Sequence, residues 1–171
     1  SIIALYRTTY QMMAMMQHLD LEIELIPSSC WYTNVRSNVK AATWDRMQRI
    51  EFQRTNNRCE ICDGIGSNHP VELHEKWLFD DVRQIQILTG MLVLCPSCHA
   101  VKHFGLALEQ GKSEEILRWL IKINHLTTND AVAHIQKSIE IFKIRSQFQY
   151  RLELSYLKKY NLTLDKYGIE K

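Results

Sequence analysis

Hydrophobic and polar residues alternate in two short segments near opposite ends of the chain. In residues 19–25, leucine and isoleucine alternate with aspartate and glutamate, and Pro27 follows closely. In residues 150–156, tyrosine and leucine alternate with arginine, glutamate and serine. Such alternation is typical of a half-buried strand, because successive side chains of a strand point to opposite faces. We therefore expect a strand in each segment, and the two could pair and close the domain.

A β-hairpin is predicted in the middle of the chain. The turn-rich segment TNNRCEICDGIGSNHP (residues 55–70) is followed by VELHEKW (residues 71–77) and by the apolar segment LTGMLVLC (residues 88–95). Glycine, asparagine and proline mark the first segment as loop, and the other two segments have the length and apolar content of strands. The two strands would bring the ends of the surrounding loops together.

Helices are expected in most of the remaining chain. They are predicted for residues 9–18, from a Ser37 or Asn38 cap to about residue 55, from near Cys98 to Gly111, over residues 114–123 and over residues 130–147. In the second of these, Trp44, Met47 and Ile50 share one face and would point into the core, with most of the basic residues outside. A threonine or asparagine within residues 127–129 would cap the last helix.

Length and composition favour a single soluble domain. The chain has 171 residues, of which 46% are hydrophobic and 23% are charged. That length suffices for one core, so the segments 1–57, 58–108 and 109–171 are expected to form one compact unit. No apolar run reaches the roughly 18 residues of a membrane span, and the opening residues lack the pattern of a signal peptide. We expect an α+β protein without a membrane segment.

Four of the five cysteines form two C-x-x-C pairs. They are Cys59, Cys62, Cys95 and Cys98, in the spacing C-x2-C-x32-C-x2-C. Two such turns supply four thiolates to a tetrahedral zinc ion with little strain, and the spacer leaves room for the hairpin. Zinc would then supply much of the folding free energy of a segment with little core of its own. A degenerate knuckle or a redox pair is the alternative, and Cys30 is expected to be a small buried residue.

Three histidines surround the second cysteine pair and the hairpin. His99 follows Cys98 directly and His103 lies four residues later, so both imidazoles would share one helix face. His74 would approach from the first strand of the hairpin. Three histidine ligands with an open coordination position make a candidate catalytic metal site, distinct from the cysteine site. Each histidine taken alone is more often a structural residue.

The basic residues are concentrated before the first cysteine pair. Six of the eight charged residues from Arg36 to Arg58 are basic, which gives this segment a net charge of +4 in a chain whose formal net charge is +2. Such a segment is typical of a protein that binds a polyanion, although a solvated helix face would have the same composition. The candidate phosphate-binding residues here and near the histidines are Arg46, Arg49, Arg54, Arg58 and Lys102.

The motifs CEIC, VELHEKW and CPSCHAVKH resemble those of the HNH endonucleases. The resemblance covers roughly residues 58–108 and extends to a bacterial subgroup with His-Glu in place of the usual His-His or Asp-His. It implies a zinc-stabilised ββα-metal finger, treble-clef-like, which would be embedded in a mainly helical domain with a small flanking strand pair. It also implies a metal-dependent nuclease in the cytoplasm of a bacterial or phage-infected cell, with a role in phage biology, restriction or defence.

Carried over residue by residue, the resemblance assigns His74, His99 and His103 to a catalytic metal. The four cysteines become the ligands of a structural zinc ion. The histidine that usually acts as general base in this family falls on Glu75, and the central asparagine falls on Gly90. Glycine offers no side chain for the orienting hydrogen bonds of that asparagine. Two of the three positions that name the family therefore depart from its pattern.

The chemistry expected of Glu75 depends on where its side chain points. A carboxylate can accept a proton from water, or bind Mg²⁺ or Mn²⁺ through a hard oxygen. On a regular strand, however, Glu75 and His74 point to opposite faces, so both reach one site only if the strand bends. The same alternation places Glu72 beside His74, where it could orient the imidazole. Asp80 and Asp81 are expected to be loop residues.

These observations predict three functions from different classes. The first is a nuclease that hydrolyses phosphodiester bonds of DNA, or of RNA, with structural Zn²⁺ and a catalytic Mg²⁺, Mn²⁺ or Ni²⁺. The second is an inactive zinc-finger module that only binds nucleic acid. The third is a protein-interaction module, in which Trp119 and Phe142 of the helical region would contact a partner, although their spacing is also that of core residues. A nuclease of this kind needs a homodimer or larger complex, or two sites, to cut both strands.

Overall fold

The fold is a three-stranded sheet surrounded by helices. The computed structural model describes residues 2–16, 18–66 and 70–165, so the predicted segments that include residues 17, 67–69 or 166–171 lie partly outside the described residues. In chain order the elements are α1 (Ile2–Ala14), η1 (Ser28–Cys30), α2 (Val35–Asn38), α3 (Ala41–Arg54), β1 (Glu72–Asp80), β2 (Ile85–Leu94), α4 (Pro96–Lys102), α5 (Phe104–Glu109), α6 (Ser113–Asn124), α7 (Thr128–Arg145), β3 (Arg151–Glu153) and η2 (Ser155–Tyr160). The predicted α+β class is confirmed.

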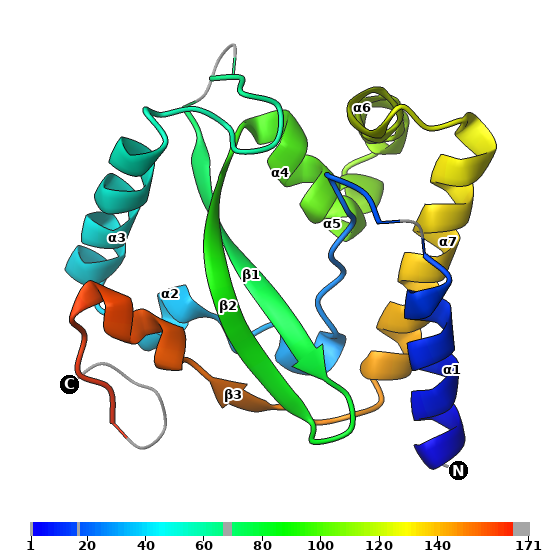
Figure 1. The fold of residues 1–171 in the computed structure, drawn as a ribbon, viewed down its shortest axis with the longest axis horizontal. Helices are drawn as coiled ribbons and strands as arrows, with labels where there is room; N and C mark the ends of the chain where they lie inside the picture. The colour runs from blue at the N-terminus through cyan, green and yellow to red at the C-terminus, as the bar shows by residue number, and fades with distance from the viewer. Residues whose placement is uncertain (1, 17, 67–69, 166–171) are drawn as a thin grey trace.

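The predicted hairpin is confirmed and lies at the centre of the molecule. Strands β1 and β2 are antiparallel, with Glu72 opposite Leu94 and His74 opposite Leu92, and the register shifts between Lys76 and Trp77. Figure 1 shows α3 and η2 on one side of this hairpin and helices α4 to α7, with α1, on the other side. Among the described residues, none of the helices has the length and apolar character of a membrane span.

The predicted pairing between residues 19–25 and residues 150–156 is wrong. The alternation in burial is present, since Leu19, Leu21 and Ile23 are buried, but residues 19–25 form no strand. Their backbone N–H groups are satisfied elsewhere: that of Leu21 donates to the Asn124 side chain and that of Ile23 donates to Nε2 of His134. The late strand, β3, pairs instead with β2 in a parallel arrangement.

The helices agree with prediction in type, and less well in their bounds. The predicted cap at Ser37 or Asn38 is wrong, because both residues lie inside the short helix α2, and the long helix α3 begins only after the extended residues Val39 and Lys40. Trp44 is buried as expected, but Ile50 is 42% exposed and does not face the core. The predicted cap of the last helix is confirmed, since the Thr127 hydroxyl accepts a hydrogen bond from the Asp130 backbone.

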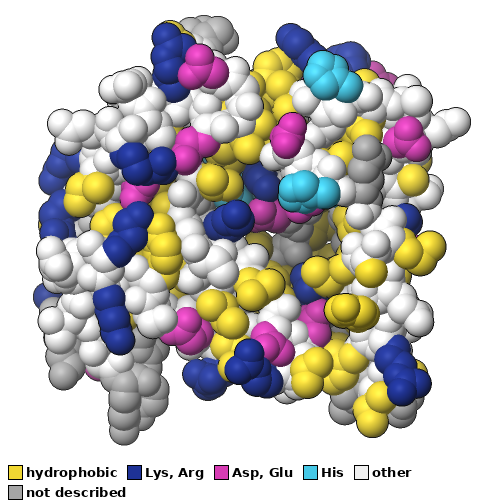
Figure 2. Space-filling view, viewed as in Figure 1, with side chains coloured by type: hydrophobic (Ala, Val, Ile, Leu, Met, Phe, Trp, Pro, Cys, Tyr) yellow, Lys and Arg dark blue, Asp and Glu magenta, His cyan; other side chains and the backbone are white. Residues whose placement is uncertain are grey.

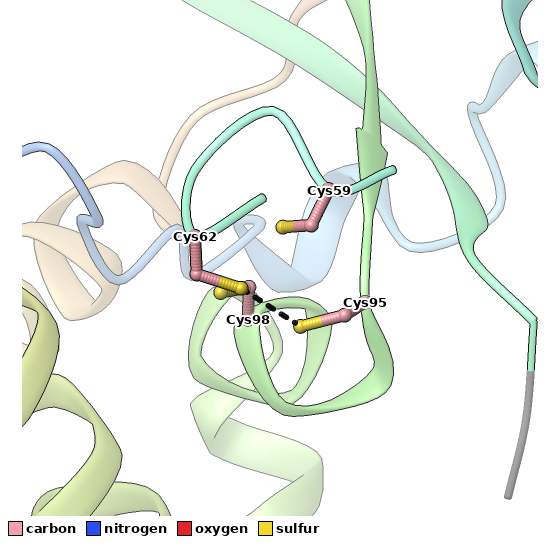
Figure 3. Close-up of side chains that lie close together, drawn as sticks. All are labelled: Cys59, Cys62, Cys95 and Cys98. Carbon is pink, nitrogen blue, oxygen red and sulfur yellow. Dashed lines mark hydrogen bonds between the residues drawn. The ribbon is translucent and has the colours of Figure 1, made fainter. Parts of the chain in front are cut away.

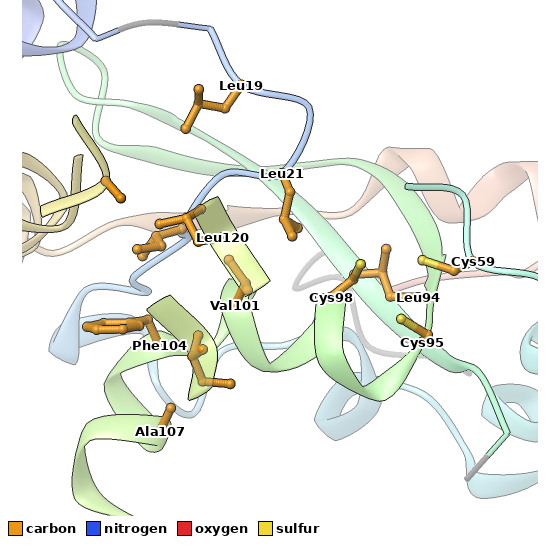
Figure 4. Close-up of a cluster of buried hydrophobic side chains, with 13 residues drawn as sticks. Leu19, Leu21, Cys59, Leu94, Cys95, Cys98, Val101, Phe104, Ala107 and Leu120 are labelled. Atoms are coloured by element: carbon orange, nitrogen blue, oxygen red, sulfur yellow. The ribbon is translucent and has the colours of Figure 1, made fainter. Parts of the chain in front are cut away.

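Two buried hydrophobic clusters hold these elements together, one on each side of the hairpin. The first joins the cysteine pairs to α4, α5 and α6, and Figure 4 shows Val101, Phe104 and Leu120 within it. The second packs α2, α3 and η2 against the hairpin through Val35, Met47 and other apolar residues. The segment with the candidate metal ligands is therefore packed on both sides, which fixes the relative positions of β1 and α4.

Candidate metal centres

The four cysteines of the C-x-x-C pairs converge on one point. Cys59 and Cys62 lie in the loop after α3, and Cys95 and Cys98 lie at the start of α4 (Figure 3). Their sulfur atoms all lie within 4.8 Å of one another, and Sγ of Cys62 is 3.5 Å from Sγ of Cys95. Zinc–sulfur bonds of about 2.3 Å in a tetrahedron separate the sulfurs by roughly 3.8 Å. The four sulfur atoms are therefore close enough to hold a zinc ion, and all four cysteines are free of disulfides.

Local backbone geometry shapes the first cysteine turn. The backbone N–H of Cys59 donates to the Gly64 carbonyl, and that of Asp63, whose φ is 60°, donates to the Cys59 carbonyl. A Cβ atom on Gly64 would lie 3.2 Å from Sγ of Cys62, closer than ordinary van der Waals contact. Glycine at this position lets the loop close around the sulfur atoms.

The chemistry of the sulfur atoms fits a divalent cation. A hydrogen bond from the Cys98 thiol lowers the pKa of Cys59 to about 4, whereas burial raises the pKa of Cys62 to about 11. Four thiolates at these distances repel one another, and a cation offsets this repulsion. The indole N–H of Trp119 also donates to Sγ of Cys98 at 3.3 Å. The four cysteines could therefore hold a zinc ion.

The three predicted histidines form a second group. His99 lies on α4, His103 ends that helix, and His74 lies on β1. One ring nitrogen from each lies within 4.8 Å of the others, and the Nε2 atoms of His99 and His103 are 3.0 Å apart. The ring of His74 meets the other two edge-on, with centroids 5.3 and 5.1 Å away. Nitrogen atoms from two different elements therefore converge on one position.

A carboxylate holds the outer nitrogen of two of these rings. Glu72 on β1 forms a hydrogen bond with Nδ1 of His99, which leaves Nε2 of His99 facing His103. Glu24 lies 2.9 Å from Nε2 of His74 through its Oε2 atom. The prediction that Glu72 orients His74 is therefore wrong, because Glu72 pairs with His99. Histidine ligands of metals commonly donate their second N–H to a carboxylate in this way.

Sequence reasoning missed Glu24. Its Oε1 atom accepts a hydrogen bond from Nζ of Lys102 at 2.7 Å, so one carboxylate joins a lysine of α4 to a histidine of β1. Burial raises the pKa of Glu24, but the His74 hydrogen bond and the Lys102 charge outweigh it and lower the pKa to about 2. Lys102 is only 5% exposed. Its predicted contact with a nucleic-acid backbone does not fit this buried ion pair.

Burial favours the metal-binding form of the imidazoles. It lowers the pKa of His99, and it lowers the pKa of His103 to about 4. Both rings are therefore neutral at pH 7, with a nitrogen lone pair available to a cation. This electrostatic state favours a metal site over a cluster of charged histidines.

Glu75 is not a member of the histidine group, because its carboxylate is held by the backbone of α2. Its Oε1 atom accepts hydrogen bonds from the backbone N–H groups of Val35 and Arg36, at 2.9 and 3.3 Å. These are the first two residues of α2, so the carboxylate caps that helix together with Asn34, whose side chain accepts from Ser37. Burial raises the pKa of Glu75. Glu75 and the neighbouring His74 therefore have different partners, the α2 backbone and Glu24 respectively.

The other positions of interest near the hairpin are structural. Gly90 lies opposite Lys76 at the register shift, with Lys76 side-chain carbons 3.8 Å from a Cβ built there. Asp80 pairs with Arg83, and Asp81 accepts hydrogen bonds from Arg145 and Tyr150. Neither aspartate belongs to the candidate ligand groups found among the described residues, and Asp80 is the last residue of β1 and not the expected loop residue.

The predicted nucleic-acid-binding arginines differ in how far they are already engaged. Arg54 donates to Glu51 and Glu60, and its pKa is raised by these hydrogen bonds. Arg46 donates to the Tyr160 carbonyl, and Arg58 donates to the Asp63 carbonyl. Arg49 is exposed on α3. Figure 2 shows Lys and Arg side chains spread over the side of the molecule where Figure 1 places α3 and η2.

Comparison with protein-family models, with curated proteins and with solved structures found no match to this chain.

Proposed function

We propose that the protein is a metal-dependent phosphodiesterase that acts on DNA, with a ββα-metal finger of the HNH type as its catalytic unit. The observation that carries this proposal is the histidine group. Three imidazoles converge from β1 and α4. Those of His99 and His103 are neutral at pH 7, and those of His74 and His99 are hydrogen-bonded to carboxylates. The four-cysteine group fixes the start of the same helix. Four thiolates are the donor set typical of a structural zinc site, and three imidazoles are a donor set typical of a catalytic metal site.

Three histidine ligands leave part of a metal's coordination sphere open. A divalent cation such as Mg²⁺, Mn²⁺ or Ni²⁺ at this position would stabilise negative charge on a phosphate group and its leaving oxygen. Around it, Glu24 and Glu72 hold the rings of His74 and His99 in place. Arg49 and Arg46 on α3, with Arg58 in the loop after that helix, would contact the DNA backbone, which predicts salt-sensitive affinity with little sequence preference.

The carboxylates near the histidines are suited to positioning more than to proton transfer. A pKa of about 2 makes Glu24 a weak base at neutral pH. Glu75 has a raised pKa, which suits a base better, but its oxygen is held by the N-terminus of α2. We therefore assign Glu75 to helix capping in place of the base role that its sequence position implies.

The proposal is tested by incubating zinc-loaded protein with supercoiled plasmid in Mg²⁺, Mn²⁺, Ni²⁺ or EDTA. We expect metal-dependent nicking that is lost in His74→Ala and His99→Ala. The matched control is His125→Ala, because His125 ends α6 in a left-handed conformation and lies outside the histidine group. Equal nicking by all three variants would contradict the assignment.

A zinc-finger module that binds nucleic acid without cleaving it is the second candidate. Two observations favour it: Gly90 supplies no side chain at the position of the family's asparagine, and Glu75 caps α2. Gel-shift binding of DNA without nicking under any of these metals would support this candidate and would overturn the first.

A further inference from the structure

A large cavity lies beside the histidine group, between β1 and α7. Its volume is about 730 Å³, within the range of small-molecule sites. The walls are mostly apolar and include Leu25, Trp31, Trp77, Leu106, Ile139 and Phe142. Figure 2 shows the molecule hollowed in this region, beside the side formed by α1 and α7. Protein interiors are close-packed, so an apolar cavity of this size is typical of a ligand site.

The cavity is continuous with the candidate metal centre. His74, His103 and Glu24 line it together with the apolar residues. A group bound in the cavity would therefore lie next to anything held at the histidines. If a phosphate of the substrate lies at the histidines, the nucleoside attached to it is the part of the substrate nearest to the cavity.

The charged groups that line the cavity repel a phosphate and can form hydrogen bonds with a nucleobase. Of the three carboxylates that line it, that of Glu24 is paired with Lys102, which leaves those of Glu75 and Glu109 against one ammonium group, that of Lys143. Carboxylates repel phosphate oxygens, whereas they accept hydrogen bonds from the N–H groups of a nucleobase. Indole rings provide flat surfaces on which a base can stack.

Trp31 is placed at the entrance of the cavity. It is 56% exposed although it lines the cavity, and its indole N–H donates to the Ile26 carbonyl at 3.0 Å. The hydrogen bond restrains the ring. The neighbouring residue, Tyr32, is 88% exposed and does not line the cavity. Tyr32 is therefore a suitable control for substitutions of Trp31.

We propose that this cavity binds an unpaired nucleobase of the nucleic-acid substrate, next to the phosphate at the histidines. The proposal rests on the proposed function. A base inside a duplex is stacked on both faces and paired along its edge, so it reaches a cavity only from a single strand or after extrusion from the helix. The protein should therefore bind single-stranded or distorted DNA more tightly than a regular duplex.

The first test uses 2-aminopurine deoxyribonucleoside, a fluorescent probe without a phosphate, so that neither the metal nor surface charge can account for its binding. We expect saturable quenching with an affinity about 10-fold lower in Trp31→Ala, which is the size of effect expected from the loss of one stacking contact. Trp31→Phe should restore most of the affinity, and Tyr32→Ala should leave it unchanged. Absence of saturable quenching, or equal losses in Trp31→Ala and Tyr32→Ala, would overturn the proposal.

The second test separates this proposal from the proposed function. A short DNA strand with 2-aminopurine at one position is compared with the same strand in a duplex, and plasmid nicking is measured in parallel. We expect at least about 10-fold tighter binding of the single strand. Nicking without any preference for the single strand would overturn the cavity proposal alone. Base binding without nicking would overturn the nuclease and leave the cavity as a nucleobase site.

Discussion

Replacing Glu24 by glutamine should weaken metal binding at the histidine group. The Glu24 carboxylate accepts hydrogen bonds through both oxygens, from Lys102 at 2.7 Å and from the ring of His74 at 2.9 Å. Glutamine has nearly the same shape, but one of its two terminal atoms is a donor. If its oxygen faces Lys102, its NH₂ group faces His74 and opposes the N–H that Glu24 accepts. If it is turned around, the NH₂ group meets the ammonium group of Lys102.

The size of the effect follows from these contacts. At an effective dielectric constant of about 20, charges 2.7 Å apart attract by roughly 6 kcal/mol, most of which desolvation offsets. Removing one partner of a buried pair costs about 3–5 kcal/mol. Because Glu24 is 22% exposed and glutamine keeps one hydrogen bond, we expect about 2–3 kcal/mol loss of stability. Loss of a carboxylate that orients a histidine ligand should weaken metal affinity about 10- to 100-fold.

Both quantities can be measured against a matched variant. Calorimetric titration with Mn²⁺ or Ni²⁺ gives the affinity, and urea denaturation gives the free energy of unfolding. The control is Glu22→Gln, two residues away, because the side chain of Glu22 is 41% exposed and its salt bridge is to the exposed His18. Unchanged metal affinity in Glu24→Gln, or equal effects in both variants, would refute the assignment of Glu24 as a positioning residue.

The remaining predictions concern Glu75, the zinc site and His134. Glu75→Gln should keep most of the plasmid-nicking rate. Glu75→Ala should lower the free energy of unfolding by about 1 kcal/mol, because it removes the cap of α2. A large loss of nicking rate in Glu75→Gln with normal stability would instead assign Glu75 as the general base. Cys98→Ser should lower zinc content, measured by mass spectrometry, and the melting temperature, while Cys30→Ser, buried away from the zinc site, should retain its zinc. Burial lowers the pKa of His134 below 6.5, so the unfolded state binds the proton more readily than the folded state. The free energy of unfolding should therefore fall as the pH decreases through about 6.5. His134→Gln keeps an acceptor for the Ile23 N–H and should remove this pH-dependent contribution, measured by urea denaturation at a series of pH values.

Features with a local sequence signature could be predicted. The two C-x-x-C turns and the hairpin between them follow from residue types within a few positions of each other. So does the spacing of His99 and His103 on one helix. The cap at Thr127 was found for the same reason. Alternation along β1 also raised the doubt that Glu75 reaches the metal, and its carboxylate is in fact hydrogen-bonded to the backbone of α2.

Features that depend on distant residues could not be predicted. Glu24 contacts His74 across 50 positions and Lys102 across 78 positions. Nothing in the sequence distinguishes Glu24 from Glu22, because both are acidic positions of the same alternating segment. Residues 19–25 have the burial pattern of a strand, yet side chains of α6 and α7 take the hydrogen bonds that a neighbouring strand would supply. Burial periodicity alone does not specify which groups satisfy the backbone.

The most direct test of the central claim is the rate of plasmid nicking by His103→Ala compared with the unaltered protein, at matched zinc content. His103 belongs to the histidine group and not to the cysteine group, so its loss should leave the zinc site loaded. We predict Mn²⁺- or Mg²⁺-dependent nicking by the unaltered protein and a loss of at least about 100-fold in His103→Ala. Nicking at the same rate in the variant, or no nicking by the unaltered protein with any divalent metal, would contradict a catalytic role for the histidine group.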